Sequence, residues 1–211
     1  EVIDCGGNLL MPAFCNAHCH AAMTLFRGYG EDLPLKEWLE TRIFPAEDRL
    51  TFRSVYHASM LAIAEMLRHG IASFSDMYMF EDAVAEAVLA TGIKANLSRS
   101  LVSFDPDIDM AKEQRTVEAV RLAEWYHGCD EGRLLVDFSL HAEYTNVPKA
   151  CEYVADLARR CRTGMQIHLS ETEREHAECL ERWGKTPAEF FRDTGVFDVP
   201  TTAAHCVWVT D

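Results

Sequence analysis

Positive charge is scarce in this chain of 211 residues. It carries 20 lysine and arginine residues against 34 aspartate and glutamate residues, so its formal net charge is −14. Nucleic acids and anionic membrane surfaces are bound mainly through basic patches. The shortage of basic residues therefore argues against both of these partners.

Long apolar runs, low-complexity linkers and paired-cysteine motifs are missing as well. No apolar stretch approaches the roughly 18 residues that would indicate a membrane span. The eight cysteines, at positions 5, 15, 19, 129, 151, 161, 179 and 206, form no C-x-x-C motif. We interpret them as reduced thiols of a cytoplasmic protein, with Cys151, Cys161 and Cys206 as small buried hydrophobic residues.

The chain does contain a regular alternation of strand-like and helix-like segments, and 48% of its residues are hydrophobic. Apolar runs predict strands, and helical spacing predicts helices between them. The expected strands are 11–18, 71–78, 93–102, 133–144, 164–172 and 201–209, and the expected helices are 52–70, 81–92, 110–127, 148–162 and 173–194. About six βα repeats of this kind indicate an α/β protein with a parallel sheet covered by helices.

Two architectures fit such repeats, a doubly wound sheet and a β/α barrel. A doubly wound sheet would usually carry a glycine-rich phosphate turn after its first strand, and this chain has none. Histidines instead fall at or near the ends of several different strands, which a barrel brings to one centre. We therefore expect a TIM-type (β/α)8 barrel, of which this chain supplies about six units.

The stretch "NAHCH", residues 16–20, ends the first expected strand. Side chains alternate along a strand, so His18 and His20 share one face and Cys19 lies on the other. Two imidazoles on one face can bind one metal ion, although two histidines can also end a strand without any such role. The pair alone leaves both interpretations open.

Further histidines and a carboxylate follow later strands. His168 lies in "GMQIHLSETERE", with Glu171 three residues beyond it, and His205 ends "TTAAHC". Three imidazoles with an open position are typical of catalytic zinc, and a nearby carboxylate can move protons. Glu171 also fits the acidic first turn of the following helix. A lone histidine such as His205 would more often be a buried core residue. Here it is the fifth histidine at or near the end of an expected strand, after His18, His20, His141 and His168, and so we interpret it as part of the site.

Four motifs in this order closely resemble the amidohydrolase superfamily, and the resemblance covers essentially the whole chain. They are "MPAFCNAHCHAAMTLFRGYGEDLPLKEWLETRIFPAE", "HAEYT", "IHLSETERE" and "AHCVWVTD". Within the superfamily, the chain is similar to 5-methylthioadenosine/S-adenosylhomocysteine deaminases and the chlorohydrolases grouped with them. The resemblance implies a barrel hydrolase that releases ammonia from an adenine nucleoside thioether.

The resemblance also implies one divalent metal ion, most commonly Zn²⁺. His18, His20 and His168 would be its ligands. Glu171 would be the proton shuttle, and His205 would hydrogen-bond the water that the metal activates. The stretch "DFSLHAEYT" holds no lysine to supply the bridging ligand of two-metal relatives, which favours a single ion.

The substrate contacts come from the same resemblance. His141 would contact the purine ring, Glu47 would bind the ribose hydroxyls, and Trp38 would line the pocket. Arg99 would reach the far end of the substrate. Residues 21–51 form a long segment after the first strand, which places them at the catalytic rim of a barrel. Without the resemblance, Trp38 and Glu47 would be interpreted as ordinary helix residues.

Two departures from the family pattern bear on these expectations. Glu143 stands where the family motif has proline, and it could alter ring recognition or face solvent. The aspartate that relatives carry on an eighth strand is missing, since the sixth expected strand is the last. We therefore expect residues 12–211 to be a partial barrel, and residues 1–11 to be the exit strand of a small β-sandwich domain.

The substrate alternatives stay open. Another aryl substrate, such as guanine, cytosine or a chlorotriazine, would use the same metal chemistry. A different class of outcome is a truncated barrel without catalysis. Neither interpretation excludes a homo-oligomer.

Overall fold

The structure is a computed structural model, and it describes residues 2–30 and 32–210. Its strands are β1 (Phe14–Cys19), β2 (Ile71–Tyr78), β3 (Lys94–Leu101), β4 (Leu134–Val136), β5 (Phe138–Leu140), β6 (Met165–Leu169) and β7 (Thr201–His205). Its helices are α1 (Leu35–Trp38), α2 (Phe44–Glu47), α3 (Phe52–Arg68), α4 (Glu81–Thr91), α5 (Gln114–Tyr126), α6 (Cys129–Gly132), α7 (Pro148–Cys161), α8 (Glu173–Trp183) and α9 (Pro187–Asp193). Short helical turns are η1 (Ala21–Phe26), η2 (Leu39–Ile43), η3 (Glu143–Thr145) and η4 (Val196–Asp198).

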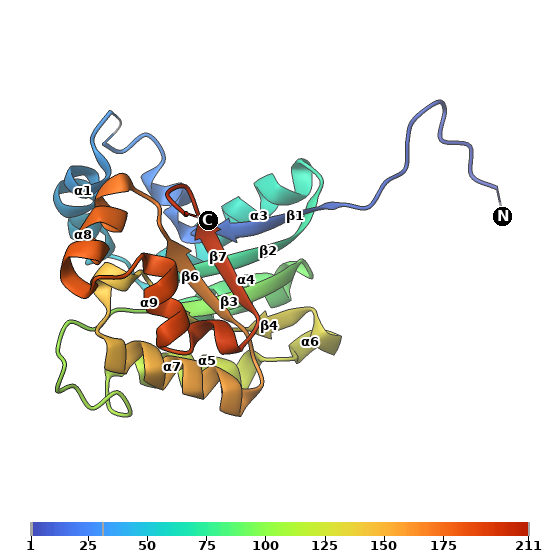
Figure 1. Cartoon of the computed structure of the whole chain (residues 1–211). Helices are drawn as coiled ribbons and strands as arrows, with labels where there is room; N and C mark the ends of the chain where they lie inside the picture. Colours follow the sequence, from blue (N-terminus) through green and yellow to red (C-terminus); the bar gives the residue numbers. More distant parts are fainter. Residues whose placement is uncertain (1, 31, 211) are drawn as a thin grey trace.

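All strand pairs in the sheet are parallel, in the order β1-β2-β3-β5-β6-β7, with β4 beside β3. Strands β1 and β7 are the two edges, yet the rings of His18 on β1 and His205 on β7 are only 5.5 Å apart. The sheet therefore curls into an incomplete barrel, with helices on its outside (Figure 1). This confirms the expected α/β barrel class.

The helices begin and end where short-range chemistry stabilises their ends. The hydroxyl of Thr51 accepts the Ser54 N–H in a reciprocal capping box, which starts α3. Pro148 occupies the first turn of α7, where a missing N–H costs nothing. Helix α4 ends at Gly92, whose φ of 73° is a left-handed conformation that glycine adopts readily.

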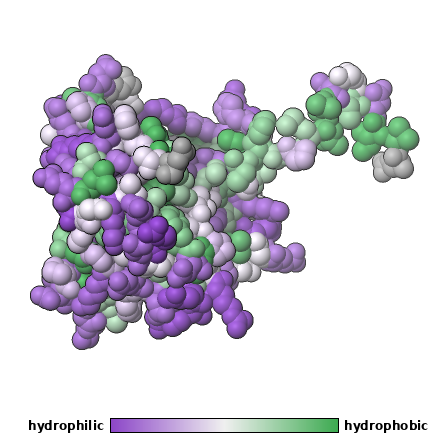
Figure 2. Space-filling model, viewed as in Figure 1, coloured by the Kyte–Doolittle hydropathy of each residue, from purple (hydrophilic) through white to green (hydrophobic). Residues whose placement is uncertain are grey.

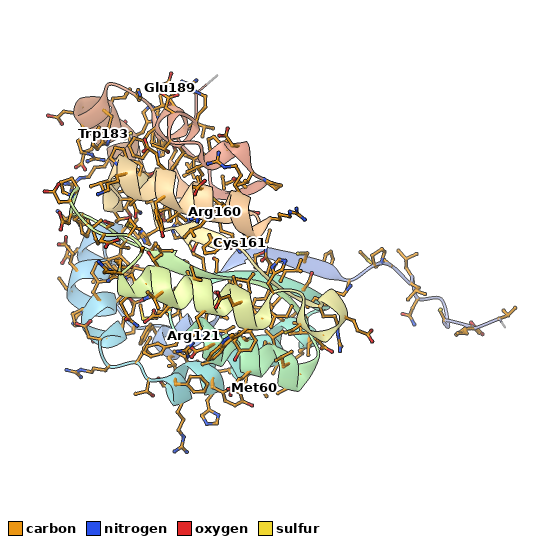
Figure 3. The ribbon with its side chains drawn as sticks, turned by 90° about the horizontal axis from the view of Figure 1, so that it is seen from below. Met60, Arg121, Arg160, Cys161, Trp183 and Glu189 are labelled. Atoms are coloured by element: carbon orange, nitrogen blue, oxygen red, sulfur yellow. The ribbon has the colours of Figure 1, made fainter. Side chains whose placement is uncertain are left out.

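Two apolar clusters fill the space between sheet and helices. One packs α3 and α4 against β2 and β3, and the other packs α7 and α9 against β5 and β6. Every residue of β6 is buried, as expected for a strand covered on both faces. Seen from below, helices α4, α5 and α7 lie side by side outside the sheet, with Arg121 on α5 and Arg160 on α7 (Figure 3).

The fourth expected strand is broken, which corrects the prediction of one strand over 133–144. Asp137 separates β4 from β5, because its carboxylate accepts hydrogen bonds from Asn96 Nδ2 (2.6 Å) and from the Gly164 N–H (2.8 Å). Gly164 also has no room for a side chain, since a Cβ there would lie 2.7 Å from the Pro200 carbonyl oxygen. The helical stretch 173–194 likewise divides into α8 and α9.

Residues 2–13 form no helix or strand and extend away from the body (Figure 1). Apolar residues gather along this segment, whereas polar residues cover most of the visible body (Figure 2). The proposed domain boundaries, 1–11 and 12–211, stay a prediction, and residues 1 and 211 lie outside the described part.

All eight cysteines are free thiols. Cys151 is buried as expected, but Cys161 is exposed near the end of α7 (Figure 3), and Cys206 is half-buried just after β7. The expectation that all three are buried hydrophobic residues is therefore wrong for Cys161. Among the helices described, none combines the length and the apolarity that crossing a bilayer requires.

Candidate metal and active site

Five histidine side chains meet at the carboxyl ends of the strands. His18 belongs to β1, His168 to β6 and His205 to β7, while His20 and His141 directly follow β1 and β5. The His168 ring lies 4.9 Å from His18, 5.3 Å from His205 and 4.8 Å from His141, measured between ring centroids. The parallel register brings all five to the same rim, as the sequence predicted.

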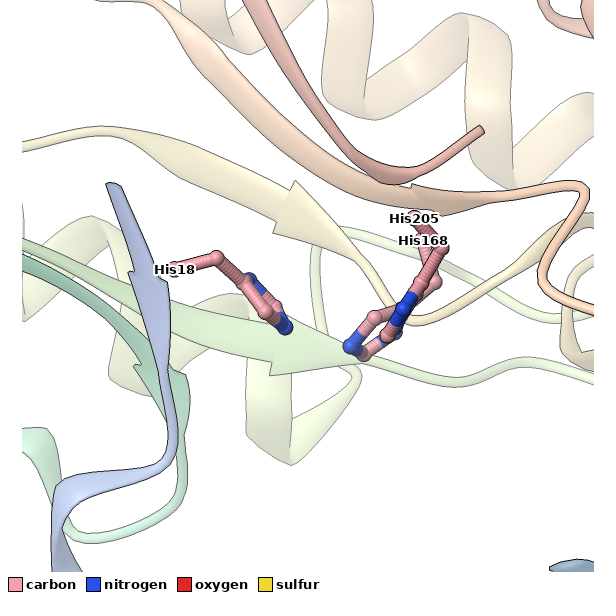
Figure 4. Close-up of side chains that lie close together, drawn as sticks. All are labelled: His18, His168 and His205. Atoms are coloured by element: carbon pink, nitrogen blue, oxygen red, sulfur yellow. The ribbon is translucent and has the colours of Figure 1, made fainter. Parts of the chain in front are cut away.

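Three of these imidazoles could hold one metal ion. Potential ligand atoms of His18, His168 and His205 all lie within 4.8 Å of one another (Figure 4). The His20 ring is close by, 5.0 Å from His18 and 5.3 Å from His168. The geometry thus groups His205 with two of the three expected ligands, and ligation by His20 stays a prediction.

Hydrogen bonds orient two of the rings for such a role. His20 Nδ1 donates to the Met77 carbonyl (2.5 Å), and His168 Nδ1 donates to the His141 carbonyl (2.7 Å). Each bond keeps the proton on Nδ1 and leaves Nε2 as a lone-pair donor. His18 Nε2 is buried without a hydrogen-bond partner among the described residues. A buried, unsatisfied ring nitrogen facing other imidazoles fits a zinc ion well.

Burial favours the neutral form of four of these imidazoles, those of His18, His20, His141 and His168, because it lowers their pKa values. Burial and the neighbouring histidines lower the pKa of His18 to about 4, and burial with the surrounding histidines lowers that of His168 to about 2. Burial likewise lowers the pKa of His141 to about 4. Neutral imidazole is the form that binds a metal, so protons compete little for these rings near pH 7.

Glu171 lies beside this cluster, as expected. Its Oε2 is 3.8 Å from His205 Nε2, and its side chain is 28% exposed. His205 and Cys206 adopt left-handed backbone conformations, with φ of 73° and 53°. Such conformations are costly in residues other than glycine and collect at functional sites.

Glu47 and Trp38 both belong to the long rim segment 21–51. The Tyr78 hydroxyl donates to Glu47 Oε1 (2.6 Å), and the Tyr78 ring lies 5.8 Å from that of His20. Glu47 is therefore brought next to the histidine cluster, and burial raises its pKa. The Trp38 indole N–H donates to the Tyr29 carbonyl (3.2 Å), a contact inside the rim segment itself.

Arg99 is not brought to the histidines. Its guanidinium Nε donates to Glu118 on α5 (2.7 Å), and it lines a cavity of about 290 Å³ near Trp125. Along β3, Asn96 donates to Asp137 between β4 and β5, and Ser98 donates to the Asp76 carbonyl of β2, whereas Arg99 reaches helix α5. Its role at the far end of a substrate stays a prediction.

The structure excludes one of the two outcomes suggested for Glu143, that it faces solvent, and an effect on ring recognition stays a prediction. Its side chain is fully buried, and Arg182 Nη2 of α8 donates to Glu143 Oε1 (2.6 Å). It therefore does not face solvent, and its ion partner lies on α8. His141 two residues earlier keeps its place in the cluster, with its ring T-shaped to Tyr144 at 5.9 Å.

Two buried carboxylates in the site escaped the sequence analysis. Asp76 on β2 accepts the Ala21 and Met77 N–H groups (both 3.0 Å) and so fixes the backbone just after His20. Glu175 on α8 accepts the N–H groups of Ser170 and Glu171. An acidic residue inside the apolar strand "IASFSDMY" and the capping pattern T-x-x-E at 172–175 were the available signals.

Known proteins match this chain over nearly all of its length. A model of the amidohydrolase family matches residues 9–211. The 5-methylthioadenosine/S-adenosylhomocysteine deaminase of Caldanaerobacter subterraneus subsp. tengcongensis is 42% identical over 210 residues, which is 100% of this chain and 48% of that protein. The 5'-deoxyadenosine deaminase of Methanosarcina mazei is 42% identical over the same length, again 100% of this chain and 48% of that protein. The chain thus spans about half the length of these relatives.

Solved structures give the same picture. An adenosine deaminase from Xanthomonas campestris with bound zinc aligns with a TM-score of 0.87 at 30% identity, over 95% of this chain and 45% of that one. The guanine deaminase of C. acetobutylicum aligns with a TM-score of 0.82 at 20% identity, over 95% and 50%, and supports the fold alone. The family model covers nearly all of the chain, and the chain belongs to the amidohydrolase family.

Proposed function

We propose that the full-length protein hydrolytically deaminates the adenine ring of a nucleoside thioether, S-adenosylhomocysteine or 5-methylthioadenosine, and releases ammonia. The observation that carries this proposal is the group of His18, His168 and His205, with ligand atoms within 4.8 Å of one another and Glu171 beside it. Relatives about 42% identical over the whole chain bear the deaminase name. The proposal concerns the whole protein, since this chain spans about half of those relatives.

A single zinc ion is the proposed cofactor. Neutral, desolvated imidazoles and the unsatisfied His18 Nε2 suit this metal. We assign His18, His20 and His168 as ligands, with His205 hydrogen-bonding the attacking water. Bound zinc would lower the pKa of a water molecule and so supply a nucleophile at neutral pH.

The residues around the cluster have distinct proposed roles. Glu171 takes the proton of the attacking water and delivers it to the departing amino group, a transfer that a positioned carboxylate performs well. His141 contacts the purine, and Glu47 binds the ribose hydroxyls. Trp38 lines the pocket and Arg99 holds the far end of the substrate. A cytoplasmic location and a small-molecule partner complete the proposal.

The test is ammonia release by the full-length protein from S-adenosylhomocysteine, methylthioadenosine, adenosine and guanine. We expect turnover of the two thioethers, and a loss of at least about 100-fold in kcat in Glu171→Gln, the scale of general acid–base catalysis. Turnover of guanine alone would replace the substrate assignment. No turnover on any of the four would contradict the proposed deaminase function.

A further inference from the structure

Glu175 makes an unusual set of contacts in the first turn of α8. Its carboxylate is buried, with only 4% of the residue exposed. Oε1 accepts the Ser170 N–H (2.9 Å), and Oε2 accepts the Glu171 N–H (2.7 Å). Hydrogen bonds to a carboxylate are roughly twice as strong as those between neutral groups.

These contacts differ from ordinary helix capping. In a capping box, the third helical residue bonds back to the N–H of the N-cap residue itself. Here the Thr172 hydroxyl accepts the Glu175 N–H (3.1 Å), but the Glu175 carboxylate reaches past Thr172 to the two residues before it. It therefore holds the turn between β6 and α8 as well as the helix end.

That turn is strained and needs outside support. Ser170 has a φ of 49°, a left-handed conformation that is costly in a residue other than glycine. Its carbonyl accepts the N–H groups of Val207 (3.1 Å) and Trp208 (3.0 Å), just after His205. One turn thus connects the Glu175 carboxylate to the segment that carries His205.

We propose that Glu175 is a positioning residue that fixes Glu171 next to His205 through the backbone of residues 170–171. The inference rests on the proposed deaminase function and deepens it. Glu171 is the only one of the two whose side chain would meet reacting atoms. Glu175 acts on the backbone that carries it, so its loss should impair proton transfer more than substrate or metal binding.

The test compares Glu175→Gln with Glu173→Gln in the full-length zinc-loaded protein. Both variants remove one negative charge from the first turn of α8, but Glu173 is exposed. The glutamine side chain keeps one oxygen that can accept a backbone N–H. Its NH2 group replaces the other oxygen and would face the second of the N–H groups of Ser170 and Glu171. We expect kcat to fall about 10- to 100-fold in Glu175→Gln, the range typical of supporting residues, with KM and zinc content within twofold of wild type. Glu173→Gln should match wild type.

The outcomes separate this inference from the proposed function. An inactive wild-type protein contradicts the deaminase function, whereas an active wild type with unchanged kcat in Glu175→Gln overturns the positioning role. A rise in KM or loss of zinc without a fall in kcat also overturns it. If Glu175→Gln does not fold, Glu175→Asp replaces it in the test. Its shorter carboxylate should lower kcat by less than the about 10- to 100-fold expected for Glu175→Gln. An unchanged kcat in Glu175→Asp would refute the inference.

Discussion

Single residues define the chemistry of this site through burial as much as through identity. The His18 and His168 rings are desolvated by the surrounding strands, which holds their pKa values at about 4 and about 2. Desolvated, partly unsatisfied imidazoles cost folding free energy unless something binds them. Functional sites commonly contain such groups, which lower the free energy of unfolding until a ligand binds.

Replacing His18 by alanine should remove zinc without unfolding the protein. His18 supplies a ligand atom of the three-imidazole group, and its Nε2 makes no competing hydrogen bond among the described residues. We expect bound zinc to fall at least tenfold, measured by elemental analysis after dialysis. His57→Ala removes an exposed imidazole on α3 and should keep full occupancy. Equal zinc content in both variants would contradict the assignment.

The buried carboxyl of Asp76 should make stability depend on pH. Burial raises its pKa from 3.8 to about 7. The unfolded chain therefore loses this proton at a lower pH than the folded chain does. The contribution of the Asp76 carboxyl to the free energy of unfolding is complete below pH 3.8 and is lost as pH rises toward 7. The wild-type free energy of unfolding minus that of Asp76→Asn, from denaturant melts of metal-free protein, should therefore decrease between pH 4 and 7. A difference that does not change with pH would disprove this account.

The residues of the site were only partly predictable from the sequence. His18, His141, His168 and His205 follow from strand ends, because parallel strands bring their carboxyl ends to one rim. Asp76 and Glu175 could not be found this way. Their partners are backbone N–H groups that only tertiary structure brings near, such as that of Ala21 for Asp76.

Helix α8 is held at both ends by buried carboxylates. At its start Glu175 bonds to the turn between β6 and α8, and near its end Arg182 pairs with Glu143 of η3. The helix therefore connects the turn after β6 to the turn after β5. The Arg182–Glu143 ion pair thus fixes α8 against η3.

Removing Arg182 should destabilise the protein more than removing a surface arginine of the same helix. Glu143 would be left buried with its charge unpaired, which costs about 1–3 kcal/mol. Arg174→Met is the matched control, because Arg174 is 64% exposed and, among the residues that the structure describes, pairs with Glu178 alone at the surface. Its free energy of unfolding should change by less than about 0.5 kcal/mol. Equal losses in Arg182→Met and Arg174→Met would show that the buried pair has no special role.

The strands and helices were predicted better from the sequence than the breaks within them. Apolar runs and helical spacing located the strands and main helices to within a few residues. The break at Asp137 was missed because it depends on Asn96 and Gly164, which lie 41 and 27 residues away in sequence. Local patterns do not contain such contacts.

At the scale of the whole molecule, the candidate metal site joins the two edges of the sheet. His18 lies on edge strand β1, and His205 lies on edge strand β7. A zinc ion held by the proposed ligands His18, His20 and His168, with its water hydrogen-bonded to His205, would therefore link β1 to β6 and β7 and stabilise the curled sheet against opening. This coupling follows from the topology, since β1 and β7 make no strand pair among the described residues.

Zinc should accordingly raise the thermal midpoint of the metal-free protein, and a chelator should reverse the effect. Binding to the folded state alone at 100 times Kd stabilises by about 2.7 kcal/mol. For a domain of about 200 residues this corresponds to a rise of roughly 5–10 °C. Thermal melts with and without zinc measure it, and His18→Ala should show little of the rise. A midpoint insensitive to zinc would mean that no folded-state site exists.

The single-metal histidine site can be tested by titrating the metal-free full-length protein with zinc. Ammonia release from S-adenosylhomocysteine and methylthioadenosine is measured at each step. We expect activity to rise linearly with added zinc and to saturate at about one zinc ion per chain. Saturation at two ions, or deamination that is complete before any zinc is added, would contradict the single-metal histidine site.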